Sequence, residues 1–197
     1  MTVGIKTWFE QYGYPVVFVS AMVEGMLLVG GYFPGIFIVF IGVILAESPA
    51  QAIAIVAVGT TGLFIAHLIN YAMGKYGWYR LFIKFGLRST LEQAQNKLLR
   101  RGGKAIFWSY WLPSMAAFTD TAAGVLHMPF RKFVIASLAG VIFWDSLVGI
   151  IVYLLKDDAL SIVSPGGTMD FIIQLSIVAV WIMILLIIDQ RRRRVGQ

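Results

Sequence analysis

An apolar stretch from Glu24 to Ala46 carries the breaks that most constrain how this chain folds. After its opening carboxylate it has no charged residue, but Gly30-Gly31 and Pro34-Gly35 interrupt it. Proline removes a backbone donor, clashes with the preceding turn and pushes the residue before it away from helical geometry. Non-helical backbone at membrane depth is tolerated where it is buried in protein or lines a wet cavity. The stretch therefore predicts two half-helices that meet at a Gly-Pro turn inside the membrane. The alternative is an ordinary spanning helix with a proline kink.

The amino-acid composition is that of an all-α integral membrane protein. Of the 197 residues, 59% are hydrophobic and only 13% are charged, which is more apolar surface than a soluble domain of this size buries. The formal charge of +6 would suggest nucleic acid as the partner of a soluble protein. Here the basic residues lie between apolar runs, as in cytoplasmic loops that face anionic headgroups. We therefore expect a single membrane domain over residues 1–197, with membrane lipids and not nucleic acid as partners.

Apolar runs and polar segments alternate along the chain. Two continuous apolar runs predict spanning helices over about 52–74 and 133–155, because about 20 apolar residues cross the hydrocarbon core. A second broken stretch, 105–128, is interrupted by Pro113, Asp120 and Gly124. A last run predicts a C-terminal transmembrane helix over about 170–189. No cleaved signal peptide is expected, because the N-terminus lacks a basic segment followed by an apolar core and a small-residue cleavage site.

The positions of the basic residues predict the orientation in the membrane. Lys and Arg are enriched on the cytoplasmic side of membrane proteins. The segment 78–104 and the tail Arg191–Arg194 carry most of them, so both are expected inside and the loop 157–170 outside. The chain is thus expected to be a multi-pass protein of the inner (plasma) membrane, with a cytoplasmic C-terminus.

The two halves of the apolar region share a spacing. Pro34 and Pro113 each precede, by 28 and 27 residues, a glycine in the following spanning helix. Five positions beyond each glycine stands an ionisable residue, His67 in the first half and Asp145 in the second. The sequence therefore predicts an inverted repeat of two re-entrant helical hairpins, each followed by a transmembrane helix, over about 13–77 and 105–155. The predicted turn residues are Gly30, Gly31, Pro34, Gly35, Pro113 and Gly124.

Ionisable residues within membrane segments are costly, so each is a candidate functional residue. Glu24, at the mouth of the first broken stretch, is predicted to carry protons, because burial favours its neutral acid form. Asp120 is a second titrating or substrate-facing acid. His67 and Asp145 lie within spanning helices, where they contact substrate or pair with each other or with backbone. Tyr110 is predicted to shape the wall of the site. The structural alternatives are an interfacial carboxylate, a satisfied core histidine and simple packing.

The motifs of soluble enzymes are missing from the sequence. It contains no phosphate-binding glycine loop, no dinucleotide fingerprint, no HExxH and no GxSxG. Two isolated histidines and scattered carboxylates do not give a metal-ligand spacing, and the absence of cysteine rules out thiolate chemistry and disulfides. We therefore expect no enzymatic activity, no cofactor and no metal.

Three groups of residues resemble the signatures of the DedA membrane proteins, which share a domain with the SNARE-associated Golgi proteins. The first group is Glu24-Gly25 followed by Phe33–Ile36, and the second is the segment Asn70–Gly77. The third group combines Ala123-Gly124 with Met128, Phe133, Gly140 and Trp144. The resemblance covers roughly residues 13–155. It implies two opposed re-entrant hairpins and the movement of lipids or lipid-linked phosphates across the bilayer, often coupled to protons.

The chain departs from the family pattern at the positions that would bind an anion. Ile36 stands where an acidic residue is usual, Tyr110 and Ala116 stand in place of two arginines, and Asp120 stands where proline is common. Arginine is the natural clamp for phosphate. The sequence therefore predicts a DedA-like transporter or flippase for a lipid, a lipid-linked phosphate or a small polar solute. The alternatives are a proton-coupled cation exporter, a non-transporting scaffold or assembly factor, and a lipid-modifying enzyme. Assembly into a homo-oligomer stays open.

Overall fold

The computed structural model describes residues 2–27, 35–77, 79–84, 86, 88–111 and 113–156, which belong to one compact unit and form helices without a strand. Three of the predicted turn residues, Gly30, Gly31 and Pro34, lie outside the described residues. The C-terminal helix expected over about 170–189 and the basic tail lie outside them as well.

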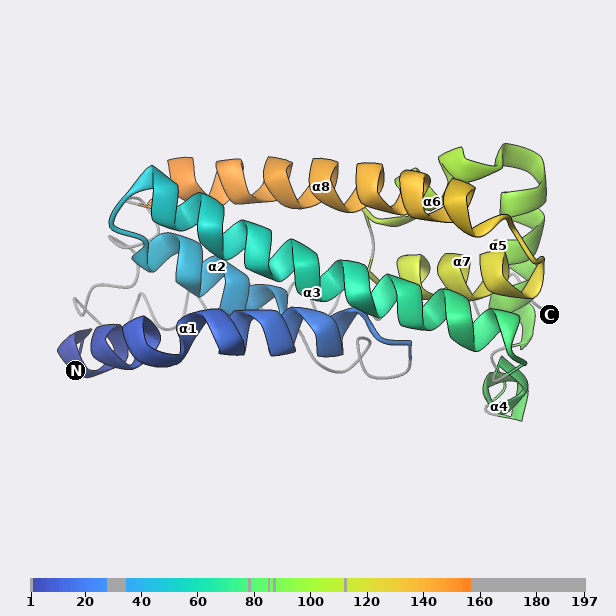
Figure 1. Cartoon of the computed structure of the whole chain (residues 1–197), viewed down its shortest axis with the longest axis horizontal. Helices are drawn as coiled ribbons and strands as arrows, with labels where there is room; N and C mark the ends of the chain where they lie inside the picture. The colour runs from blue at the N-terminus through green and yellow to red at the C-terminus, as the bar shows by residue number, and fades with distance from the viewer. Residues whose placement is uncertain are drawn as a thin grey trace, which may run out of the picture. The chain divides into compact units, whose positions relative to one another are not determined.

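Two long helices, α3 (Pro49–Lys75) and α8 (Phe130–Leu154), form the centre of this unit and run in opposite directions side by side (Figure 1). They are the two helices in the described part of the chain that are long and apolar enough to cross a membrane. Each begins three residues before the predicted position. At α3 the reason is a cap: the Ser48 hydroxyl accepts a hydrogen bond from the Gln51 N–H, and Pro49 starts the first turn, where its missing N–H is not needed.

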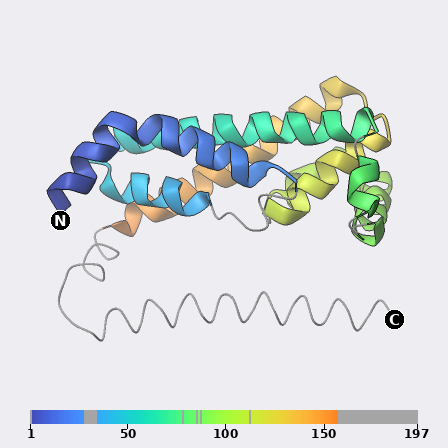
Figure 2. The ribbon, with the colours of Figure 1, turned by 90° about the horizontal axis from the view of Figure 1, so that it is seen from below.

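Two helix pairs lie at opposite ends of α3 and α8. Helices α1 (Thr2–Gly25) and α2 (Ile36–Leu45) lie along the first half of α3. Helix α7 (Pro113–Val125) lies along the second half of α3, and α6 (Gly103–Ser109) lies against α8 (Figure 1). Within each pair the two helices pack against each other (Figure 2). Helix α3 also contacts α7, and α8 also contacts α2, so each long helix touches both pairs.

The kinked-helix alternative for residues 24–46 is wrong. Helix α1 ends at Gly25, residues 26, 27 and 35 are not helical, and α2 starts at Ile36. The half-helix before the break therefore lies upstream of Glu24, within α1. Glu24 was predicted at the mouth of the first broken stretch, but it lies in the last turn of α1.

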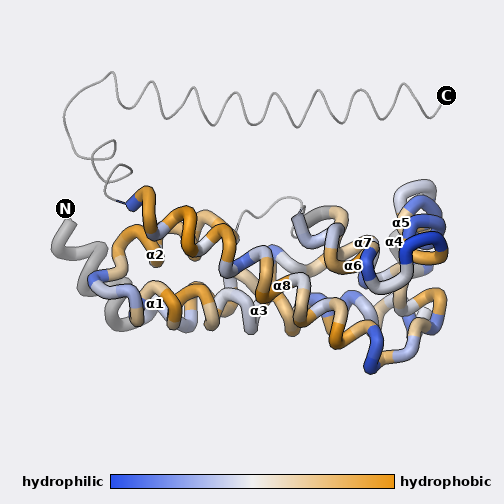
Figure 3. The backbone as a smooth tube through the Cα atoms, turned by 90° about the horizontal axis from the view of Figure 1, so that it is seen from above, coloured by the Kyte–Doolittle hydropathy of each residue, from blue (hydrophilic) through white to orange (hydrophobic). Residues whose placement is uncertain are grey.

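The outer surfaces of α3 and α8 are apolar and exposed. Ile53 on α3 is 68% exposed, and Ile135 and Ile150 on α8 are 60% and 58% exposed. Soluble proteins rarely display apolar faces of this extent, whereas helices in hydrocarbon do so by necessity. The orange tube in Figure 3 follows these helices, while the blue, hydrophilic residues gather around α4 (Tyr79–Lys84) and α5 (Arg88–Arg101).

Helix α5, within the basic segment 78–104, is amphipathic. Its buried residues are Leu91, Ala94 and Leu98, spaced three and four positions apart on one face, and this face packs against α7 and α6. Its basic residues at Arg100 and Arg101 close the last turn, where positive charge is favourable.

Gly124 is not a turn residue, in contrast to the prediction. It lies in the last turn of α7, where a Cβ would come within 2.0 Å of the Tyr71 carbonyl oxygen of α3. A Cβ added at Gly74 of α3 would likewise lie 2.0 Å from the Thr121 carbonyl oxygen of α7. These two glycines let the backbones of α3 and α7 approach closely, as small residues do between membrane helices. Pro113 begins α7, so the second break falls just before it.

Candidate functional site

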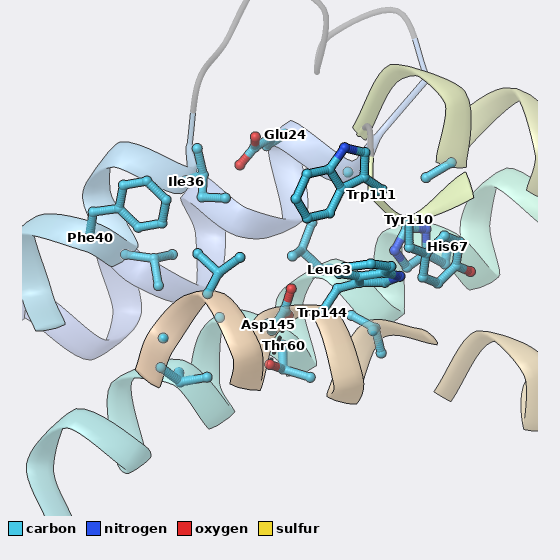
Figure 4. Close-up of a pocket in the computed structure, with 18 of the residues that line it drawn as sticks. Glu24, Ile36, Phe40, Thr60, Leu63, His67, Tyr110, Trp111, Trp144 and Asp145 are labelled. Atoms are coloured by element: carbon cyan, nitrogen blue, oxygen red, sulfur yellow. Dashed lines mark hydrogen bonds between the residues drawn. The ribbon is translucent and has the colours of Figure 1, made fainter. Parts of the chain in front are cut away.

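A cavity of about 210 Å³ lies where the two helix pairs meet beside α3 and α8 (Figure 4). Its polar lining comes from elements far apart in sequence: Glu24 from α1, Thr60 and His67 from α3, Tyr110 from the link after α6, and Asp145 from α8. Thr60 and Asp145 lie near the midpoints of the two long helices. A cavity of this kind, apolar in most of its wall and with a few convergent polar groups, is the usual form of a ligand site.

Glu24 projects from the last turn of α1 and is 6% exposed. The backbone N–H of Ile36, the first residue of α2, hydrogen-bonds its carboxylate. Gly35 makes this contact feasible, because a Cβ there would lie 2.3 Å from the Ser20 carbonyl oxygen. The start of α2 therefore sits directly on α1, and the carboxylate receives the favourable dipole of a helix N-terminus.

Asp145 faces the same cavity from α8. The Thr60 hydroxyl donates to its Oδ2 at 2.8 Å, so this contact joins α3 to α8. Asp145 lies close enough to both Glu24 and His67 for their charges to interact. Of the alternatives left open by the sequence, pairing of Asp145 with His67 is not observed: Asp145 accepts from Thr60, and His67 contacts Asp120.

Asp120, which was predicted to be a titrating or a substrate-facing acid, does not line the cavity. It lies in the middle of α7, is fully buried, and sits behind two lining residues. His67 Nδ1 lies 2.7 Å from its Oδ2, and the Tyr110 hydroxyl donates to its Oδ1 at 3.0 Å. Ser137 of α8 continues the cluster, with its Oγ 2.6 Å from the Tyr110 hydroxyl.

Asn70 is a site residue that the sequence analysis did not single out. Its amide donates to the Gly25 carbonyl oxygen at 2.8 Å and accepts from the Leu27 N–H at 3.0 Å. It thereby satisfies the backbone on both sides of the end of α1. One signal was present in the sequence: an amide inside an apolar run, three residues after His67, needs hydrogen-bond partners in a membrane, because an unpaired amide is costly there.

Two tryptophans, Trp111 and Trp144, belong to the aromatic part of the wall, together with Phe40 and Tyr110. Trp111 is 61% exposed and its ring stands edge to face with Trp144, at a centroid distance of 4.8 Å. The Trp144 indole N–H donates to the Phe107 carbonyl oxygen at 2.9 Å, which fixes the ring of α8 against α6. Aromatic faces attract cations through their quadrupole.

Neither Lys nor Arg is among the described residues that line the cavity. The described residues also contain no group of three or more His, Asp or Glu side chains placed to hold a metal ion. The acidic and imidazole side chains among the described lining residues are thus those of Glu24, Asp145 and His67.

The family model that describes the VTT domain matches residues 14–154. The chain therefore belongs to the VTT domain family, which includes the DedA proteins, and the resemblance found in the sequence is confirmed. The matched region includes every residue that lines the cavity.

Three curated relatives indicate what kind of protein this is. Undecaprenyl phosphate transporter A of Bacillus subtilis is 24% identical, over 91% of this chain and 92% of its own length. Protein DedA of Escherichia coli is 25% identical over 68% of this chain and 66% of its own length. An uncharacterised membrane protein of Synechocystis is 26% identical over 74% and 68%. No solved structure matches the chain. These relatives support a membrane location and a transporter-type function in general terms.

Proposed function

We propose that this protein is a membrane transporter that moves a lipid with a cationic or zwitterionic headgroup, and that the cavity holds the headgroup. The observation that carries this proposal is the lining of the cavity: two carboxylates from different helices, two tryptophans, and neither Lys nor Arg among the described residues. Carboxylates and aromatic faces bind an ammonium group, whereas a phosphate alone would face like charges there.

An apolar groove favours a lipid over a small solute. A second hollow, of about 640 Å³, runs between α3 and α8 and shares Val56, Thr60, Val141 and Gly149 with the cavity. Most of its remaining lining is apolar. A headgroup bound beside Asp145 would leave the hydrocarbon chains of the same molecule in this groove, where they remain in contact with apolar surface.

The two helix pairs support an inverted-repeat transporter. In the first predicted repeat, α1 packs against α2 and against α3. In the second, α6 packs in the same way against α7 and against α8. Gly62 and Gly140 occupy matching places: the first brings α3 close to α1 at Phe18, and the second brings α8 close to α6 at Phe107. We propose that each pair is a re-entrant hairpin, and that Glu24 couples transport to protons by alternating between its charged and neutral forms.

Headgroup selectivity in liposomes tests the proposal. Purified protein is reconstituted with phosphatidylethanolamine or phosphatidic acid that carries the same fluorescent acyl chain, and a membrane-impermeant quencher reports how much lipid changes leaflet. Faster movement of the amine-bearing lipid is expected. An interaction with a charged group is worth about 1.5–3 kcal/mol. Asp145→Asn should therefore weaken this transport about tenfold or more. Glu92→Gln on the exposed face of α5 is the matched control.

The same experiment tests two other functions: transport of a lipid-linked phosphate, and a scaffold that transports nothing. The Bacillus relative is named for a lipid-linked phosphate, and its match covers most of both chains. Faster movement of phosphatidic acid would favour such a substrate here and contradict the amine-bearing one. Movement of neither lipid would favour a scaffold in which Asp145 and Asp120 serve only as structural partners.

A further inference from the structure

His67 lies between the cavity and a cluster of buried polar side chains. Its ring lines the cavity, while its Nδ1 points away from the cavity to Asp120, which lines none of it. We infer that His67 exchanges protons with the cavity through Nε2, and that Asp120 is a positioning residue that fixes the ring through Nδ1. This inference concerns the site of the proposed function and relies on that function only for the use made of the proton.

The hydrogen-bond directions around Asp120 assign it the role of acceptor. A tyrosine hydroxyl has one hydrogen, and the Tyr110 hydrogen is donated to Asp120 Oδ1. In the contact between Tyr110 and Ser137 the serine is therefore the donor. Ser137 thus donates to the Tyr110 oxygen, and Tyr110 donates to Asp120. The carboxylate then accepts on Oδ2 as well, from the Nδ1–H of His67.

With Nδ1 donating to Asp120, Nε2 is the ring nitrogen left for the cavity. No protein partner for Nε2 is present among the described residues. The ring cannot turn easily, because it stacks on Tyr110 at a centroid distance of 4.1 Å and an interplanar angle of 11°. A carboxylate that accepts from one ring nitrogen, and so sets the tautomer and orientation of an imidazole, is a recurring arrangement in proteins.

The proton step balances within these groups. In the charged state the imidazolium has a hydrogen on each nitrogen and is paired with the Asp120 carboxylate. Release breaks the Nε2–H bond and passes the proton to water or ligand in the cavity. The ring is then neutral, with its remaining hydrogen on Nδ1, and Asp120 stays a carboxylate throughout. Uptake reverses the step.

Other titratable groups face His67 from the helices packed around α3. Glu24 approaches from α1, Asp145 from α8, Tyr110 from the link before α7, and Asp120 from α7 itself. Helix α2 contributes no titratable side chain. Acidic side chains therefore surround the imidazole. A cationic ligand entering the cavity would repel a proton held on Nε2, which links proton release directly to ligand binding.

Nitrogen-15 NMR tests the assignment without a transport assay. The chain has two histidines, so the variant His127→Asn leaves His67 as the only labelled imidazole; His127 has a positive φ of 51°, which asparagine tolerates. The protein is labelled with ¹⁵N-histidine in lipid nanodiscs and titrated. The expected result is that Nδ1 keeps its hydrogen at every pH while Nε2 loses its own as the pH rises. A neutral ring with its hydrogen on Nε2, or a ring that does not respond to pH, would overturn the inference.

Two variants separate positioning from packing. Asp120→Asn should raise the fraction of neutral ring with its hydrogen on Nε2 and displace the pH profile of transport. Thr121→Val is the matched control, since Thr121 is equally buried beside Asp120 but bonds only the Ala117 carbonyl of its own helix. An unchanged tautomer in Asp120→Asn, or an equal change in Thr121→Val, would contradict the positioning role.

Discussion

At the scale of single residues, Asn70 is the side chain with the clearest structural duty. It is the partner of Gly25 and Leu27 at the end of α1, so Asn70→Ala leaves a carbonyl and an N–H without that partner. Each unsatisfied group costs about 1–3 kcal/mol. We expect a lower unfolding midpoint in detergent than for Asn96→Ala, which makes the same substitution on the exposed face of α5. Equal midpoints would show that the break after α1 does not depend on Asn70.

Gly124 leads to a prediction about helix spacing. In Gly124→Ala the new methyl group meets the backbone of α3 at Tyr71, and rigid backbone cannot yield as a side-chain end can. We expect a loss of about 1–3 kcal/mol in unfolding free energy, as for overpacked cores. Gly103→Ala is the control, because its methyl group would lie 3.4 Å from the Ala136 Cβ, an ordinary contact. A stable Gly124→Ala protein would contradict the close approach of α3 and α7.

Four of the candidate residues chosen from the sequence line one cavity in the structure. Glu24, His67, Tyr110 and Asp145 were all candidates, because a polar group in an apolar helix stands out without a structure. The duty of Asp120 could not be read in this way. Whether an acid on α7 faces a cavity or the back of an imidazole depends on the rotation of α7 against α3, which glycine contacts at Gly74 and Gly124 decide.

At the scale of helices, the orientation in the membrane stays a prediction. Because α5 and the tail Arg191–Arg194 carry a basic excess, both are expected in the cytoplasm. The chain has no cysteine, so single cysteines can be introduced at exposed Glu92 or in the loop 157–170. An impermeant thiol reagent applied to intact cells should label the loop and leave position 92 unlabelled. Labelling of position 92 from outside would contradict this orientation.

The meeting of the two helix pairs can be tested by crosslinking. Leu27, just after α1, packs against Ala117 of α7 in a small buried cluster. Cysteines at these two positions should form a disulfide readily under mild oxidation. Val43→Cys with Ala117→Cys is the control, since Val43 lies in a different cluster, toward the far end of α2. Crosslinking of the control alone, or of neither pair, would refute the contact between the two pairs.

The C-terminal ends of α3 and α8 were predictable to within one residue, whereas both helices start three residues earlier than predicted. The two spanning helices followed from uninterrupted apolar runs, and the breaks followed from glycine and proline. The start of α3 was missed because Ser48 and Gln51 are polar, and their polarity signals a cap rather than a loop. Gly124 was misplaced for the opposite reason: glycine is common in turns, but between membrane helices it serves close packing.

At the scale of the whole molecule, the proposed proton-coupled transport requires that groups lining the cavity bind and release protons as the cavity binds and releases its ligand. Glu24 lines the cavity from α1, and His67, which Asp120 contacts from behind, lines it from α3. Asp145 lies close enough for its charge to interact with those of both Glu24 and His67. A charge that changes at either end alters the electrostatic environment of a headgroup bound beside Asp145.

The most direct test is the pH dependence of lipid transport by Glu24→Gln in proteoliposomes. Glutamine keeps the size and hydrogen-bonding capacity of glutamate but fixes the group uncharged, so the variant cannot alternate between two forms. Folding should survive, because the neutral group is favoured by burial. The account predicts that a pH gradient drives transport by the wild type and by Glu92→Gln, and that the gradient has no effect on Glu24→Gln. Transport by Glu24→Gln with the pH dependence of the wild type would contradict it.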